Sequence, residues 1–364
     1  MTLELRTAGE SHGPALVAIV MGLPAGLRLD RDAIDHDLRR RQEGYGRSPR
    51  QQLEQDRVEV LAGLRHGRTL GSPLALVIRN QDHENWAWGM SPWPPEGDAS
   101  GKGTTPVTLP RPGHADLAGA LKYGHDDTRH TLERASARQT AVQVAAGAVA
   151  KALLREIGIE VVGRALEIGG EATVEEWKHA TDAARADRET LGGVIEVVSD
   201  GVPPGLGSYA EKETRLDARI AAALMGIQAV KGVEIGDGFA LARVKGSEAH
   251  DEIRADRGRE TNRAGGIEGG VTNGEPVVVR AAMKPLPTLM RPLRSVDLET
   301  GEPGAALVER SDVQAVEALA VVAEAAVAWE LARAAREKFG GDALGDFLAA
   351  HTAYLERIGW PRNA

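Results

Sequence analysis

Two histidines stand in short, glycine-framed segments where their side chains could exchange protons with a bound molecule. His12 lies in residues 7–13 (TAGESHG), and His114 lies in residues 111–116 (RPGHAD). Histidine titrates near neutral pH, and a neighbouring glycine lets a ligand approach the backbone closely. Either histidine alone is more typical of an ordinary surface loop. The two together favour acid–base chemistry on a small molecule.

Arginines gather in two places, although the chain carries 53 acidic against 44 basic residues and a net charge of −9. This balance disfavours a nucleic-acid surface, so local positive clusters indicate a pocket for a small anion. Arg41 ends a predicted helix and Arg47 follows on a glycine loop, which would let both guanidinium groups grip one anion. A solvated charged face is the equally weighted alternative. The first cluster comprises Arg39, Arg40, Arg41, Arg47 and Arg50, and the second runs from Arg129 to Arg138.

Three further segments carry groups that could bind a ligand. Ser136 is a candidate N-cap of an alanine-rich helix, and the free N–H groups there would form an anion site that Arg134 and Arg138 reinforce. An ordinary capped helix is the commoner explanation. Glycines in residues 262–270 would let backbone amides meet a flat ligand, beside Lys284 and Thr288 in residues 283–288 (MKPLPT).

Asp312 precedes the last long helix of the sequence, directly after Arg310 and Ser311. Taken alone, it is best interpreted as a helix cap. In a site it would be a carboxylate that accepts a proton.

The composition excludes several kinds of chemistry. The chain has no cysteine, which rules out disulfides, thiolate nucleophiles and iron–sulfur clusters. There is no His-x-x-x-His pair or dense carboxylate cluster, so we expect no metal. The N-terminus lacks the pattern of a signal peptide, and no apolar run is long enough to span a membrane. We therefore expect a cytoplasmic protein that binds neither membrane nor nucleic acid.

The hydrophobic pattern predicts strands and helices that alternate irregularly. Asn273–Gly274 is interpreted as a hairpin turn before a strand at 276–280. Residues 86–105, rich in Pro, Gly and Trp, are expected to form a flexible excursion, either a lid or a loop without function. No linker divides the chain, so we expect one large α/β or α+β domain over residues 1–364. The other predicted strands are 14–20, 58–61, 74–78, 162–168 and 194–198, and the predicted helices are 30–42 (capped by Asp30), 139–157 (ending at Gly158), 211–225 and 312–338.

Eight segments in order along the chain together resemble the chorismate synthase family. The resemblance implies a β-α-β sandwich of the α+β class, a homotetramer, and an enzyme that eliminates phosphate from 5-enolpyruvylshikimate 3-phosphate to give chorismate. It also implies dependence on reduced FMN, with NADPH as a candidate reductant of the flavin. The segments are residues 9–13, 40–47, 111–116 with 122–124, 133–138, 230–236, 265–270, 283–288 and 310–312.

The resemblance also implies roles for individual residues. His12 would protonate the departing phosphate, and His114 would protonate or hydrogen-bond the reduced flavin. Asp312, with Ser11 as a relay, would act as the base toward the flavin nitrogen. Arg41, Arg47 and Arg138 would bind substrate or NADP, with Arg134 also near the substrate anions. The residues that would hold FMN are Arg134, Ala135, Ser136, Gln228, Ala229, Gly269, Lys284, Pro285, Leu286, Pro287, Thr288 and Arg310.

Ala135 departs from the family pattern, which usually has serine at this position. The lost hydroxyl would remove one phosphate or flavin contact, while the backbone amide remains. Two other functional classes stay open at this stage. A flavin oxidoreductase would consume NADPH in step with product, and a catalytically silent anion-binding protein would tolerate loss of both histidines.

Overall fold

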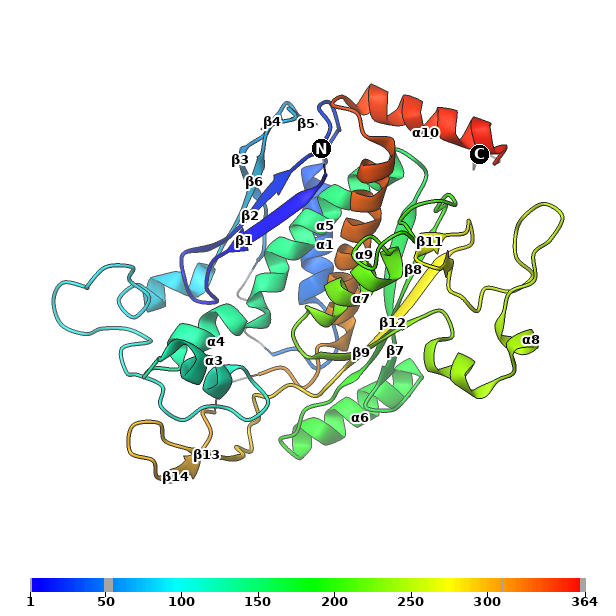
Figure 1. Ribbon diagram of the computed structural model, residues 1–364. Coiled ribbons are helices and arrows are strands. Elements are labelled where there is room, and N and C mark those ends of the chain that lie inside the picture. The colour runs from blue at the N-terminus through cyan, green and yellow to red at the C-terminus, as the bar shows by residue number, and fades with distance from the viewer. Residues whose placement is uncertain (1, 49–54, 309–310, 361–364) are drawn as a thin grey trace.

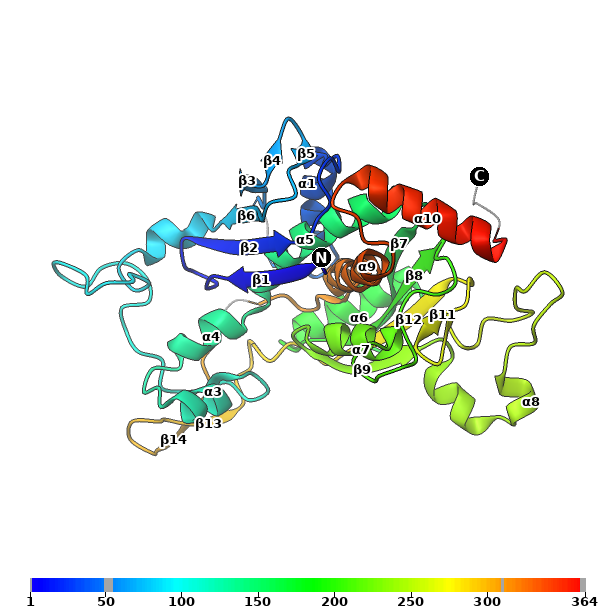
Figure 2. The ribbon, with the colours of Figure 1, turned by 45° about the horizontal axis from the view of Figure 1, so that its top comes forward.

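Two four-stranded antiparallel sheets enclose a layer of helices in this chain, as Figures 1 and 2 show from two directions. The structure is a computed structural model that describes residues 2–48, 55–308 and 311–360. Each sheet turns its apolar face inward, and the two longest helices between them are buried along most of their length. The arrangement is therefore the β-α-β sandwich of the α+β class that the resemblance implies.

The first sheet has the order β1 (Glu4–Ala8), β2 (Ala15–Met21), β6 (Leu74–Arg79) and β3 (Glu59–Ala62). Alternate residues of β2 are buried against the helices, as the two-residue period of a strand requires. The strands predicted at 14–20, 58–61 and 74–78 are confirmed to within about one residue at each end. β1 was not predicted.

The second sheet has the order β7 (Glu160–Ile168), β8 (Gly193–Asp200), β12 (Val277–Met283) and β9 (Val230–Ile235). The strands predicted at 162–168 and 194–198 are confirmed. The hairpin predicted at Asn273–Gly274 is wrong, because β12 pairs with β8 and β9 on its two sides. The local hairpin joins β10 (Ile267–Glu268) to β11 (Val271–Thr272) and turns at Gly269–Gly270, where both glycines have positive φ.

The central layer contains α1 (Arg31–Gln42), α5 (Thr140–Arg155), α7 (Leu216–Met225) and α9 (Val316–Phe339). Asp30 caps α1 as predicted, since its side chain accepts from the Asp32 amide at 2.9 Å. Three predicted helix boundaries are wrong. α5 ends at Arg155, before the predicted end at Gly158. α7 begins five residues later than predicted, because Thr214 closes a turn with Ser208 and Glu211. α9 begins at Val316 rather than at 312.

Helices α5 and α9 approach each other closely at Gly147, which faces Ala325. A Cβ built on Gly147 would stand 2.3 Å from the Cβ and 2.6 Å from the Cα of Ala325. Because the backbone of α9 cannot move away without disturbing its packing, we expect Gly147→Ala to lower the free energy of unfolding by about 1–3 kcal/mol. Urea unfolding measures this. Gly345→Ala in α10 (Leu344–Ile358), where a Cβ meets nothing within 4 Å, is the matched control and should not be destabilising.

A buried ion network joins the three long helices of the layer. Glu324 of α9 accepts two hydrogen bonds from Arg40 of α1, both at 2.8 Å, and one from Lys151 of α5 at 2.5 Å. Lys151 also pairs with Asp37. Burial alone would raise the pKa of the Glu324 carboxyl, but the bond from Arg40 and the charge of Lys151 outweigh it and lower that pKa. The network fixes the end of α1, from which Arg41 projects.

The remaining elements lie outside the sandwich. Trp86 ends η1 (Gln81–Trp86) and is buried, so the irregular excursion begins one residue later than predicted; its flexibility stays a prediction. No helix in the described ranges is both long and apolar enough to cross a membrane. The other elements are β4 (Leu64–Arg65), β5 (Arg68–Thr69), α3 (Asp116–Tyr123), α4 (Arg129–Ala135), η2 (Ala137–Gln139), α6 (Val174–Ala186), η3 (Gly238–Arg243), α8 (Gly246–Ala249), β13 (Arg294–Val296) and β14 (Pro303–Ala305).

Candidate active site

A cavity of about 560 Å³ opens where the start of α5, the end of β12 and the segment before α9 meet. Its volume is in the range of small-molecule sites. Residues far apart in the sequence form its wall, because loops from both sheets reach this place, including those after β1 and after β12. The sequence-predicted residues among them are Ser11, Arg41, Arg47, His114, Ala135, Ser136, Arg138, Gln228, Ala229, Lys284, Leu286, Pro287, Thr288 and Asp312.

Four predicted residues do not line this cavity, and Arg310 lies outside the described residues. The exposed Arg134 side chain turns away, because its nitrogens donate to the carbonyl oxygens of Gly9 and Thr7, each at 3.1 Å. Gly269 lies at the turn of the β10–β11 hairpin. Pro285 and His12 are also outside the wall, although Ser11, the neighbour of His12, is part of it.

His12 is held directly behind the cavity wall by Glu133 and Trp86. The Nδ1 atom lies 2.9 and 3.0 Å from the two carboxylate oxygens of Glu133, and the His12 amide donates to the same group at 2.8 Å. The imidazole stacks on Trp86 with 4.0 Å between ring centroids. Burial would raise the pKa of Glu133, but the hydrogen bonds from His12 prevail and lower it. The ring plane is thus fixed and Nδ1 is committed to a carboxylate.

His114 lines the cavity and is held in a similar way. Its Nδ1 lies 2.5 Å from Oδ1 of Asp116, which is fully buried. Arg111 donates to the same carboxylate from Nε at 2.8 Å and to Oγ1 of Thr288 at 3.1 Å. Burial would raise the pKa of Asp116, yet the hydrogen bonds from His114 and Arg111 hold it well below its usual value. Each predicted catalytic histidine therefore has a buried, ionised carboxylate at Nδ1.

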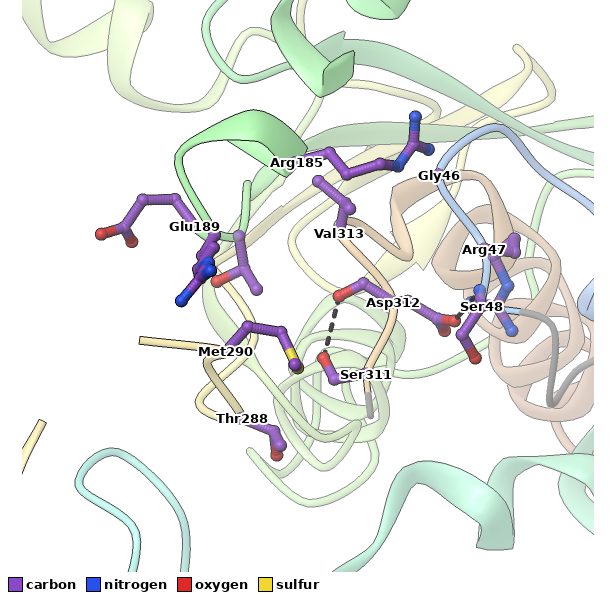
Figure 3. Close-up of a pocket in the computed structure, with 12 residues that line it drawn as sticks. Gly46, Arg47, Ser48, Arg185, Glu189, Thr288, Met290, Ser311, Asp312 and Val313 are labelled. Carbon is purple, nitrogen blue, oxygen red and sulfur yellow. Dashed lines mark hydrogen bonds and ion pairs between the residues drawn. The ribbon is translucent and has the colours of Figure 1, made fainter. Parts of the chain in front are cut away.

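Asp312 is not a helix cap. One carboxylate oxygen pairs with Arg47 Nη1 at 2.9 Å, and the other accepts from the Ser48 amide at 2.6 Å. Figure 3 shows these three residues side by side, at the edge of a smaller hollow of about 210 Å³ that adjoins the cavity. The first turn of α9 is capped instead by Gln314, whose Oε1 accepts from the Val316 amide at 2.7 Å.

Arg41, Arg47 and Arg138 line the same cavity, as an anion site requires. Burial lowers the pKa of the Arg41 guanidinium to about 10, and the nearby Asp56 works against that shift. Burial also lowers the pKa of Arg47, whose Nε is buried without a hydrogen-bond partner in the part of the chain that the structure describes. A buried, unpartnered donor of this kind is a point at which a ligand oxygen would bind.

The opposite wall has features that suit a flat heterocycle. Gln228 Oε1 is buried and has no hydrogen-bond partner among the described residues, so it can accept from a ring N–H. Ala229 has a φ of +69°, a conformation that non-glycine residues rarely adopt and that often marks functional sites. Leu286 and Pro287 give an apolar surface. Lys284 donates to the Gly113 carbonyl at 2.7 Å, and burial lowers its pKa.

Several residues that hold this site were missed from the sequence. Glu133 and Asp116 belong to segments already singled out, where an acidic residue inside an otherwise basic motif was an available signal. Asp56, Asn80 and Trp86 had no such signal, because their partners are distant in the sequence. Among the described residues, no three His, Asp or Glu side chains gather as metal ligands would.

Comparison with known proteins agrees with this geometry. The family model described as chorismate synthase matches residues 3–335. The chain is 54% identical to the chorismate synthase of Desulforudis audaxviator over 98% of both chains, and 53% identical to that of Rubrobacter xylanophilus over 99% of this chain and 98% of the relative. The chain belongs to the chorismate synthase family. The predicted membership, and with it the prediction of a lyase, is confirmed.

A solved chorismate synthase structure has the same fold as this chain. Its title is "Crystal Structure of Chorismate Synthase", and it superposes with a TM-score of 0.78 at 38% sequence identity, over 98% of both chains. The sandwich is therefore the fold of the family, and the excursions described above do not prevent alignment along nearly the whole chain.

Proposed function

We propose that the enzyme catalyses the anti-1,4-elimination of phosphate from 5-enolpyruvylshikimate 3-phosphate to give chorismate, the last common step of the shikimate pathway to aromatic amino acids, with reduced FMN in the same cavity. The observation that carries this proposal is the single cavity that collects three arginines, His114, Asp312 and Ser11 in a member of this family. The substrate bears two carboxylates and a phosphate, so its site must be strongly cationic.

Arg41, Arg47 and Arg138 would bind these anionic groups. A guanidinium offers a planar fork of donors that matches carboxylate and phosphate oxygens. Arg47 can meet such an oxygen with the Nε that lacks a protein partner. Because each of the three arginines is already held by a carboxylate, and Arg41 also by the Thr140 hydroxyl and the Ala137 carbonyl, little ordering remains for the substrate to impose.

Reduced FMN would fit the wall formed by Gln228, Ala229, Lys284 and residues 286–288, with Ser136 and Ala135 beside it. When bound, the flavin supplies transient electron donation that helps to expel phosphate, with no net oxidation. Gln228 would accept a ring N–H, and Leu286 and Pro287 would exclude water. The predicted contacts of Arg134, Gly269 and Pro285 with FMN stay predictions, because these residues do not line the cavity, and that of Arg310 stays a prediction because it lies outside the described residues.

The two histidines and Asp312 would move protons. His12, with Nδ1 on Glu133, would donate to the departing phosphate, and His114, with Nδ1 on Asp116, would donate to or hydrogen-bond the flavin. Asp312 would accept a proton, with Ser11 as the relay. Ser11 Oγ accepts from Ser136 Oγ at 3.3 Å, which places that hydroxyl on the cavity side of the His12 segment.

Arg47→Ala is expected to weaken substrate binding more than flavin binding. The substitution removes a cationic donor that the proposal assigns to the substrate, and it also releases Asp312 from its ion pair. We expect KM to rise about 10-fold or more, with the dissociation constant for FMN changed less. Steady-state kinetics and flavin fluorescence titration measure the two effects. A larger loss of flavin affinity would contradict the assignment.

The proposed reaction is tested by an anaerobic assay of phosphate release from 5-enolpyruvylshikimate 3-phosphate with chemically reduced FMN. Release of phosphate with formation of chorismate supports the proposal, and no release overturns it. A parallel assay under air, with oxidised FMN and with or without NADPH, decides whether the enzyme reduces its own flavin. Consumption of NADPH in step with product would instead indicate an oxidoreductase with net electron transfer.

We further propose that the enzyme acts in the cytoplasm as a homotetramer, with residues 1–364 as one domain. The family model spans residues 3–335, which is most of the chain. Analytical ultracentrifugation would test the tetramer.

A further inference from the structure

Asp56 stands behind the cavity wall, between two of its arginines. Its carboxylate oxygens lie 2.7 and 2.8 Å from Nη1 of Arg138, and one of them lies 3.5 Å from Nη1 of Arg41. The residue is only 2% exposed. Arg41 and Arg138 line the cavity, whereas Asp56 does not. Asp56 therefore touches both arginines without being placed where a ligand would contact it.

The position of Asp56 is fixed from the end of α1. Its amide donates to Oε1 of Gln42 at 3.2 Å, and two residues later the Val58 amide donates to Oδ1 of Asp35 at 2.9 Å. Both acceptors belong to the same helix that carries Arg41. The carboxylate and the Arg41 guanidinium are thus held by one rigid element.

Two neighbouring guanidinium groups repel each other, and burial strengthens that repulsion. The shared carboxylate offsets it, while further bonds set the direction of each group. Arg41 donates from Nε to Thr140 Oγ1 at 2.8 Å and from Nη2 to the Ala137 carbonyl at 3.1 Å. Arg138 donates from Nε to Asn80 Oδ1 at 2.9 Å.

We propose that Asp56 is a positioning residue that holds the guanidinium groups of Arg41 and Arg138 side by side as a paired receptor for the anionic groups of the substrate. The inference rests on the proposed function for the identity of that substrate. Beyond that function, the inference is that Arg41 and Arg138 act as a pre-arranged pair rather than as independent charges. Their counter-ion, Asp56, lies outside every motif recognised in the sequence.

The test compares Asp56→Asn with the wild type. Asparagine keeps the size of the side chain and removes the charge. We expect the KM for 5-enolpyruvylshikimate 3-phosphate and its calorimetric Kd, measured with oxidised FMN, to rise about 10- to 100-fold. We expect kcat to stay within about threefold and the Kd for FMN within about twofold. The matched control is Glu59→Gln, which removes an exposed ion pair between Glu59 of β3 and Arg79 of β6. It should change none of these values.

Two outcomes would overturn the inference. An unchanged substrate Kd in a folded Asp56→Asn enzyme would show that the arginines hold their places without Asp56. A lower Kd would show that Asp56 merely reduces the positive charge of the cavity. Circular dichroism and the melting temperature establish folding in each case.

If Asp56→Asn does not fold, the double variant Asp56→Asn/Arg138→Gln is compared with Arg138→Gln, because it removes one charge from each side of the pair. A substrate Kd within about threefold of the single variant indicates that Asp56 acts through Arg138. A Kd below that of the single variant contradicts the proposal, because it would show that Asp56 only reduces the positive charge of the cavity. Failure of the wild type to release phosphate would instead overturn the proposed function, and calorimetry with inorganic phosphate would still report on Asp56.

Discussion

His12→Asn is expected to lower kcat about 10²- to 10⁴-fold, the usual contribution of a general acid. Asparagine is chosen because its side-chain N–H can take the place of Nδ1–H in the bond to Glu133, whereas alanine would remove that donor from the buried carboxylate. The variant therefore removes proton donation with the smallest disturbance of the fold. The affinity for the substrate should change little, since the proposal assigns substrate binding to the arginines.

Single-turnover phosphate release under anaerobic conditions measures this effect. His36→Ala, at an exposed position of α1, is the control and should retain full activity. Glu133→Gln provides a second variant, because it keeps the size of the side chain but replaces the carboxylate that holds Nδ1 of His12. We expect its kcat to fall less than that of His12→Asn, since the imidazole remains. Turnover of His12→Asn within threefold of wild type would exclude His12 as the acid.

His114→Ala is expected to lower turnover by at least about tenfold while FMN still binds. His114 lines the cavity, and the loss of a proton donor costs more than the loss of one contact. The fold should tolerate the change, because the Asp116 carboxylate keeps its bonds from Arg111. Turnover with saturating reduced FMN and the Kd for FMN give the two readings.

Asp116→Asn separates orientation from proton transfer at the same position. The imidazole remains and the amide oxygen can still accept from Nδ1, but the negative charge beside the ring is lost. A loss of turnover smaller than that of His114→Ala, with unchanged flavin affinity, would agree with an orienting carboxylate. Unchanged turnover in His114→Ala would remove His114 from the mechanism.

Much of the sandwich could be predicted because its elements carry local signals. The apolar run of residues 14–20 marks a buried strand, and Asp30 marks the start of α1. The failures have long-range causes. Asn273–Gly274 is a strong local signal for a hairpin, but the residues after it gain more by pairing with β8 and β9 in the middle of a sheet.

The candidate site likewise divides into residues with a local sequence signal and residues whose partners are distant in the sequence. The glycine-framed histidines and the arginine clusters were visible as unusual local composition. Asp312 looked like a helix cap because its real partners, Arg47 and Ser48, stand more than 260 positions earlier in the chain. Glu133, Asp116 and Asp56 were missed as functional groups for a related reason, since a carboxylate acquires such a role only when folding buries it against a particular cation or imidazole.

The place of α9 in the chain has a consequence for biosynthesis. This helix packs against α5 and both β7 and β8, yet it is the second-last helix to leave the ribosome. Until residues 316–339 emerge, the inward faces of β7 and β8 lack their main helix partner, and Asp312 has not reached Arg47. A nascent or truncated chain that ends before α9 should therefore expose apolar strand surface, need chaperone protection and aggregate readily.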